Sequence, residues 1–154
     1  LAPVECLETP ALLVFAGIEP TSVPCYPITQ QIAEKYHAFT RPHVSGVSSR
    51  VKDFVDMLLL AEMRELDSDS LRQAIRATFD DHKTHELPVR VPLPSKEWSR
   101  PFLKIANEVG LEFESLPDAG AALQQFLEPA LEAEAHLRWN PTNWYWEEIK
   151  GQRC

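Results

Sequence analysis

Apolar residues recur at helical spacing in the stretch ITQQIAEKYHAF, which covers residues 28–39. At about 100° per residue, one stripe of the predicted helix carries Ile28, Ile32, Tyr36 and Phe39. Lys35 falls within the same stripe, whereas Glu34 and His37 fall on the far side. Because a helix with this pattern has to bury its stripe against other elements, the sequence predicts a helical core with a lysine at its margin.

Two interpretations of Lys35 are open at this point. A lysine can pack its methylene groups against apolar neighbours while its ammonium group reaches water. Alternatively, the stripe lines a pocket, and Lys35 points at an anion. The pattern of one helix does not decide between them.

Four further segments have helical patterns. They cover residues 50–63, 67–82, 101–110 and 117–136. Ser48 or Ser49 is the predicted cap of the first of these helices, and Asp67 or Ser68 is the predicted cap of the second. The inner face of the helix within 67–82 is predicted to carry Leu71, Ile75, Thr78 and Phe79. The fold is therefore predicted to be mainly α, with a bundle of about five helices.

Prolines separate these helices from extended segments. Residues 1–27 hold several prolines around the apolar run ALLVFAGI, a composition that predicts one or two short strands joined by turns. Residues 88–101 hold Pro88, Pro92, Pro94 and Pro101, which predicts an extended linker. We therefore divide the chain into a short β segment over residues 1–27 and a helical domain over residues 28–154.

Composition limits the classes of function. The 154 residues are 44% hydrophobic, enough for one core, and no apolar run approaches the length of a membrane span. The net charge of −8 means that contact with a nucleic acid requires a local basic patch. The three cysteines lack the spacing of metal ligands and favour reduced thiols. These features predict a cytoplasmic protein without membrane contact.

A second ionisable residue lies at the margin of an apolar helix face. In the stretch RVKDFVD, Asp53 borders the face that carries Phe54 and Met57, whereas Lys52 and Asp56 point further outward. A short loop joins this helix to the helix of Lys35, so the two residues can meet. A partly buried Lys–Asp pair is either a structural ion pair or part of a functional site.

The same segments resemble, in order and spacing, the carboxyl-terminal half of the AbiEii/AbiGii family of nucleotidyltransferase toxins. The resemblance covers about residues 24–131. Its most specific parts are A-E-K-x-x-A at residues 33–38 and R-x-K-D-x-x-D at residues 50–56. It implies that the chain is the carboxyl-terminal part of a DNA-polymerase-β-like nucleotidyltransferase from a bacterial toxin–antitoxin pair.

The resemblance implies a reaction and a set of roles. A nucleotide would pass from a nucleoside triphosphate, with Mg²⁺, to an acceptor, which we expect to be RNA and in particular tRNA. Lys35 would contact the triphosphate, and Asp53 would orient Lys35, a group on the base side or the acceptor. Arg50 and Lys52 would form the basic patch that meets nucleotide or RNA, unless they are only a solvated helix start. A cognate antitoxin is the expected protein partner.

The sequence departs from the family in one respect. The family's metal-binding motif, a Gly-Ser turn followed by aspartates, does not occur before Lys35. Because two-metal transfer needs carboxylates that bind Mg²⁺, we expect this chain alone to be inactive, to hold no metal and to follow the catalytic strands of a longer protein. The alternative is a helical binding module without catalysis.

Two other groups of residues are weaker candidates. His82 and His85 have the spacing of a metal-binding pair, but no third ligand accompanies them. The aromatic residues Trp139, Trp144, Tyr145 and Trp146 could stack on bases. Packing of the chain end across the helices is the commoner reason for such a group.

Overall fold

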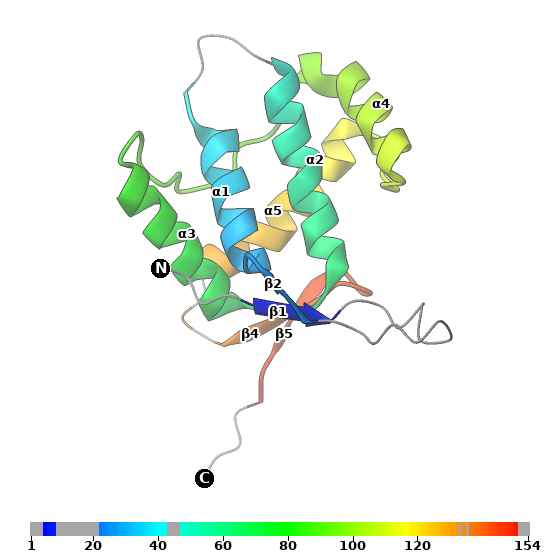
Figure 1. Cartoon of the computed structure of the whole chain (residues 1–154). Coiled ribbons are helices and arrows are strands. Elements are labelled where there is room, and N and C mark those ends of the chain that lie inside the picture. Colours follow the sequence, from blue (N-terminus) through cyan, green and yellow to red (C-terminus); the bar gives the residue numbers. More distant parts are fainter. Residues whose placement is uncertain (1–4, 9–21, 43–46, 133, 135, 151–154) are drawn as a thin grey trace, which may run out of the picture.

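The computed structural model describes residues 5–8, 22–42, 47–132, 134 and 136–150. In chain order, its elements are β1 (Glu5–Glu8), β2 (Ser22–Cys25), α1 (Ile28–Thr40), α2 (Val47–Met63), β3 (Leu66–Asp67), α3 (Ser68–His82), the 3-10 turn η2 (Lys96–Trp98), α4 (Ser99–Val109), α5 (Leu116–Glu132), β4 (Leu137–Asn140) and β5 (Tyr145–Glu148). The prediction of a mainly α fold with five helices and an initial β segment is confirmed (Figure 1). The apolar run at residues 11–18 lies outside the described residues.

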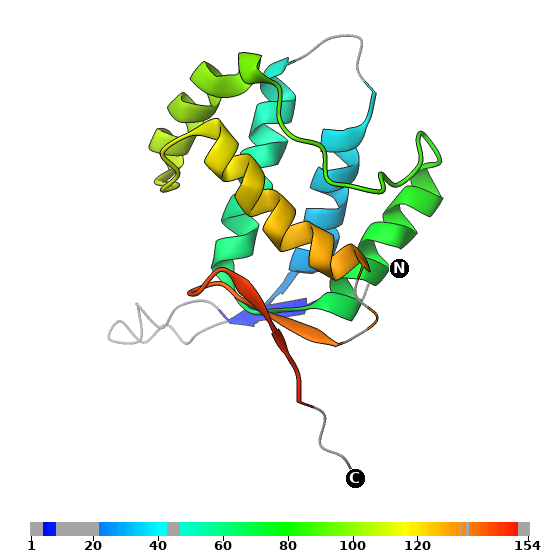
Figure 2. The same ribbon diagram turned by 180° about the vertical axis from the view of Figure 1, so that it is seen from behind.

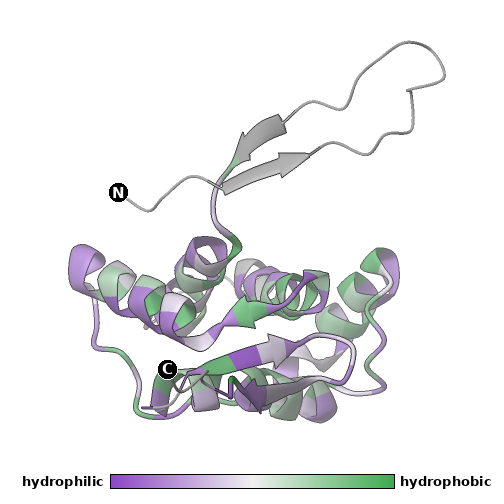
Figure 3. Ribbon diagram, turned by 90° about the horizontal axis from the view of Figure 1, so that it is seen from below, coloured by the Kyte–Doolittle hydropathy of each residue, from purple (hydrophilic) through white to green (hydrophobic). Residues whose placement is uncertain are grey.

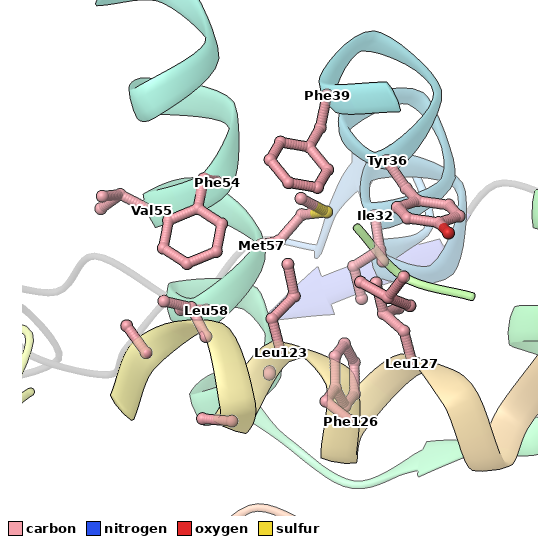
Figure 4. Packing of buried hydrophobic residues seen from close by; sticks show 14 of the residues in the cluster. Ile32, Tyr36, Phe39, Phe54, Val55, Met57, Leu58, Leu123, Phe126 and Leu127 are labelled. Carbon is pink, nitrogen blue, oxygen red and sulfur yellow. The ribbon is translucent and has the colours of Figure 1, made fainter. Parts of the chain in front are cut away.

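The core lies between α1, α2 and α5. Figure 4 shows side chains from these three helices meeting in one cluster. Among its fully buried members are Ile32, Tyr36, Phe54, Met57, Leu58, Leu123, Phe126 and Leu127. Each large apolar side chain that folding removes from water stabilises the chain by roughly 1.5–3 kcal/mol. This cluster therefore holds α1 and α2, the helices with the candidate site, in a fixed relation.

Helix α1 packs against α2 on one side and against α3 on the other. Its buried surface is consequently wider than a single stripe. The prediction that His37 lies on the far, solvated side is wrong, because only 5% of this residue is exposed. Its ring packs against Phe79 of α3, with the ring centroids 5.0 Å apart.

The helix ends follow the local sequence signals in two cases. The carboxylate of Asp67 caps α3 by accepting a hydrogen bond from the backbone N–H of Ser70 at 2.8 Å. Gly110 ends α4 with a φ of 74°, a conformation that glycine adopts without a steric penalty. The predicted cap of α2 is wrong, because the helix already begins at Val47, before Ser48 and Ser49.

The proline-rich segment after α3 passes in front of α1 in the view of Figure 2, and hydrogen bonds fix it to α5. The side chain of Gln124 donates a hydrogen bond to the carbonyl of Val91 at 2.9 Å, and the N–H of Val91 donates to the carboxylate of Glu128 at 3.1 Å. A Cβ on Gly120 would lie only 3.0 Å from Pro94, so the absence of a side chain permits this close approach. The predicted extended linker is confirmed, and it is part of the helical body.

The end of the described chain forms a sheet that the helical reading of the sequence missed. Strands β3, β4 and β5 pair antiparallel in that order, and Figure 3 views the helices from the end that β4 and β5 cover. Trp139 is fully buried and donates a hydrogen bond to the carbonyl of Ala61, while Trp146 donates to the carbonyl of Phe126, both at 2.8 Å. These contacts confirm that Trp139 and Trp146 pack the chain end against the helices.

Candidate functional site

Lys35 on α1 forms ion pairs with two carboxylates on α2. Its Nζ atom lies 3.1 Å from Oδ1 of Asp53 and 2.8 Å from Oδ2 of Asp56. Asp53 and Asp56 are three residues apart, a spacing that places both side chains on one side of a helix. The resulting charged cluster, which we call the clamp, consists of Lys35, Asp53 and Asp56, with two carboxylates on one ammonium group.

The clamp lies at the margin of the α1–α2 contact and is open to solvent. About a third of the Lys35 side chain is exposed, as are 17% of Asp53 and 28% of Asp56. Between the same two helices, the rings of Phe39 and Phe54 pack with their centroids 5.8 Å apart. This aromatic contact helps to join the two helices, and the charged groups beside them are partly open to solvent.

Two opposing effects set the charge of Lys35. Partial burial acts to lower the pKa of its ammonium group, but the hydrogen bonds to Asp56 and Asp53 and the charges of these carboxylates outweigh it. The net result is a pKa raised above the ordinary value of 10.5. Lys35 is therefore a permanent cation at neutral pH and is unsuited to act as a general base.

The donor geometry of Lys35 leaves room for a ligand. An ammonium group has three N–H donors, and within the described part of the chain Asp53 and Asp56 are its only polar contacts. A third N–H can thus be donated to an oxygen of a bound group. The clamp can present one fixed cation to a phosphate oxygen.

The same geometry does not fit Mg²⁺ at the two aspartates. Each carboxylate turns an oxygen toward Lys35, so a metal ion there would have to compete with the ammonium group. Over the residues that the structure describes, no group of three or more His, Cys, Asp or Glu side chains could hold a metal ion. We derive no catalytic step through a metal at Asp53 and Asp56.

Asp56 is a member of the site that the helical pattern misplaced. The pattern indicated that Asp56 points outward, yet its oxygen is closer to Lys35 than that of Asp53. The reason is that α2 contacts α1 as well as α4 and α5, so more than one of its faces has neighbours. The spacing of three residues between the two aspartates was the signal that could have identified it.

Arg50 and Lys52 lie in different environments. Arg50 is only 7% exposed, whereas Lys52 is exposed. Burial lowers the pKa of Arg50, the charge of Asp53 raises it, and the charge of Arg41 lowers it further. Because the two residues are about 200° apart around α2, they do not share one exposed face. Their predicted role toward nucleotide or RNA stays a prediction.

Three histidines, His37, His82 and His85, lie together on the side of α1 that faces α3, away from the clamp. The rings of His37 and His82 stack with centroids 4.4 Å apart, and the His85 ring lies 4.7 Å from that of His37. His82 contacts the Glu34 carboxylate at 3.0 Å, and His85 shares a hydrogen bond with the Thr40 hydroxyl at 2.8 Å. A surface cavity of about 710 Å³ opens beside His85, and its lining includes none of the three residues of the clamp.

The comparison with known families decides the class of the protein. The family model of the nucleotidyl transferase AbiEii toxin, from type IV toxin–antitoxin systems, matches residues 2–148. The chain belongs to this family. No relative was found among curated proteins. The resemblance of the sequence motifs is thus confirmed, and the clamp lies within the matched region.

Two further expectations can be set against the structure. None of the helices in the described segments is both long and apolar enough to cross a membrane. Cys25 is a free thiol. The predicted cytoplasmic location stays a prediction.

Proposed function

We propose that Lys35, Asp53 and Asp56 form the triphosphate side of a nucleotidyltransferase site, which transfers a nucleotide from a nucleoside triphosphate to an RNA acceptor such as tRNA. The observation that carries this proposal is the clamp itself, one partly exposed cation held by two carboxylates. Its residues come from the two segments that resemble the family most specifically.

The clamp suits phosphoryl chemistry because its charge is fixed in place. Negative charge develops on the transferring and leaving phosphates during the reaction, and a preorganised cation stabilises it. Asp53 and Asp56 restrict the ammonium group of Lys35 to one position and keep it protonated. Lys35 donates its remaining N–H to a phosphate oxygen, and the two aspartates act as positioning residues.

The net charge of the clamp explains why the nucleotide would have to bind together with Mg²⁺. One cation between two carboxylates carries a net charge of about −1, which repels a bare triphosphate. In this family's chemistry, Mg²⁺ bound to the nucleotide supplies charge neutralisation and Lewis acidity. Since Asp53 and Asp56 face Lys35, we propose that other carboxylates bind the metal and that the 154-residue chain alone is inactive. A cognate antitoxin would restrain the active enzyme.

The test compares nucleotide transfer by the complete product of the source gene with transfer by its Lys35→Met variant. RNA, Mg²⁺ and each of the four labelled nucleoside triphosphates are supplied in turn. Loss of a transition-state cation should lower kcat/KM at least about 100-fold. Lys150→Met, which removes another exposed lysine, should change it less than about twofold because it lies outside the clamp.

The outcomes separate the enzyme from a binding module. If Lys35→Met keeps near-normal transfer and a normal circular dichroism spectrum, the clamp is only a structural ion pair and the proposal is wrong. If the complete gene product binds RNA but transfers no nucleotide under any condition, the helical binding module replaces it. Transfer by the 154-residue chain alone would overturn the proposed inactivity while leaving the role of Lys35 to be tested.

A further inference from the structure

A row of exposed basic residues runs along η2 and α4. Lys96, Arg100 and Lys104 are each four residues apart, and all three are exposed. At a rise of 1.5 Å per residue, successive charges along α4 are about 6 Å apart. In a chain with a net charge of −8, this basic row (Lys96, Arg100 and Lys104) is a local reversal of sign.

The basic row faces away from the core. Helix α4 buries Phe102 and Ala106, and the Phe102 ring packs against Phe54 of α2 with centroids 5.7 Å apart. Arg100 and Lys104 lie about 120–160° around the helix from these two buried residues. Packing of α4 therefore requires the apolar face only and leaves the cationic face for other contacts.

The cations of this row are not neutralised by other residues in the described part of the chain. Among the described residues, none of the three forms an ion pair. By contrast, Arg72 pairs with Asp69, and Arg138 lies 3.9 Å from Glu65. Arg90 in the preceding linker adds a fourth exposed cation. Between residues 88 and 104, Glu97 is the one acidic residue, and Glu108 follows four residues after Lys104.

The packing of α4 against α2 connects the basic row to the helix that carries Asp53 and Asp56. Phe54, which contacts Phe102, follows Asp53 directly in α2. The helices α1, α2 and α4 lie side by side in Figure 1, and α2 packs against both of the others. A polymer held on α4 is thus bound to a helix that contacts α2, the helix with the two carboxylates.

We propose that the basic row binds the phosphate backbone of the acceptor RNA and holds the acceptor on α4, a helix that packs against α2. This inference rests on the proposed function. Regularly spaced lysine and arginine side chains match a polymer with regularly spaced phosphates, and such contacts give affinity without sequence preference. The basic row, rather than Arg50 and Lys52, is then the local patch that an acidic chain needs in order to bind RNA.

The test measures binding of a labelled single-stranded RNA of mixed sequence by fluorescence anisotropy. It compares the 154-residue chain with the triple variant Lys96→Gln, Arg100→Gln, Lys104→Gln, between about 50 and 200 mM salt. Loss of three phosphate contacts should weaken binding at least about tenfold at low salt and reduce the slope of log K against log salt by about 2. The control, Arg76→Gln, Lys83→Gln, Lys150→Gln, has the same net charge and should retain the wild-type slope.

Four results would overturn the inference. They are no RNA binding by the wild-type chain, an unchanged slope in the triple variant, an equal loss in the control, or tighter binding of a poly-glutamate peptide than of RNA at the same row. The last result would assign the row to an acidic protein partner. The proposed function is tested separately, by the transfer assay with Lys35→Met. That variant leaves the basic row intact, so failure of one proposal can be told from failure of the other.

Discussion

The two sides of α1 use polar residues in different ways. Toward α3, His37 is buried, packs on Phe79 and shares a hydrogen bond with the Thr84 hydroxyl at 2.8 Å. Toward α2, Lys35 stays partly exposed and pairs with two carboxylates. A buried side chain that packs and hydrogen bonds mainly specifies packing, whereas an open charged cluster contributes little to stability. The comparison indicates that the polar residues toward α3 serve packing, whereas the charged residues at the margin of the α1–α2 contact are available for chemistry.

The largest expected effect comes from breaking the α3 side. Phe79 is 5% exposed, and its ring lies 5.8 Å from that of Tyr36 and 5.0 Å from those of His37 and His85. Phe79→Ala should lower the free energy of unfolding by about 3–5 kcal/mol because it removes this packing and leaves a cavity. Urea unfolding followed by circular dichroism measures the change.

The half-exposed Leu103 provides the control for this substitution. Leu103→Ala should cost less than about 1 kcal/mol, because much of its side chain is already in water. Equal losses in the two variants would contradict the structural role assigned to the rings between α1 and α3.

A smaller effect should follow from acidification. Burial, with the charges of His82, His85 and Arg41, lowers the pKa of His37 against the opposing charge of Glu34. Burial lowers the pKa of His85 as well, and the positive charges of Arg41 and Arg50 lower this pKa further. A histidine whose pKa is lowered in the folded state binds protons more readily when unfolded. The stability is therefore complete above pH 6.5, the ordinary value, and declines as the pH falls toward the folded pKa.

Urea unfolding at a series of pH values on both sides of 6.5 tests this prediction. The decline should be smaller than the loss in Phe79→Ala. It should be shallower in His85→Gln, which keeps a side chain that can hydrogen bond to Thr40. Unchanged stability over this range in the wild-type chain would show that the histidines do not couple protonation to folding.

The sequence predicted one side of α1 better than the other. The stripe of Ile28, Ile32, Tyr36 and Phe39 is buried as expected, and the meeting of Lys35 with Asp53 was foreseen as an alternative. His37 was misplaced because a single wheel assumes one buried face, whereas α1 has neighbours on two sides. Which helices pack together is a property of the tertiary fold that one segment's periodicity does not contain.

The sheet of β3, β4 and β5 was missed for a related reason. Its strands have two to four residues, too short for an alternating pattern to stand out from the aromatic residues around Trp139. Long-range contacts define it, such as the hydrogen bond from Trp139 to Ala61. Asp56 shows the same limit within the site, since its partner is on another helix.

The smallest expected effect on stability concerns the clamp itself. A double-mutant cycle with Lys35→Met and Asp56→Asn should give a coupling free energy of only about 0.2–1 kcal/mol, because the pair is partly exposed. Since the pKa of Lys35 is raised, this contribution is complete below 10.5 and is lost as the pH rises through the folded pKa. A coupling of several kcal/mol would assign the clamp to the fold. The informative result is a small coupling together with a loss of nucleotide transfer of about 100-fold in Lys35→Met. An ion pair that hardly stabilises the folded chain cannot account for such a loss through unfolding. The two carboxylates would then position the lysine for a ligand.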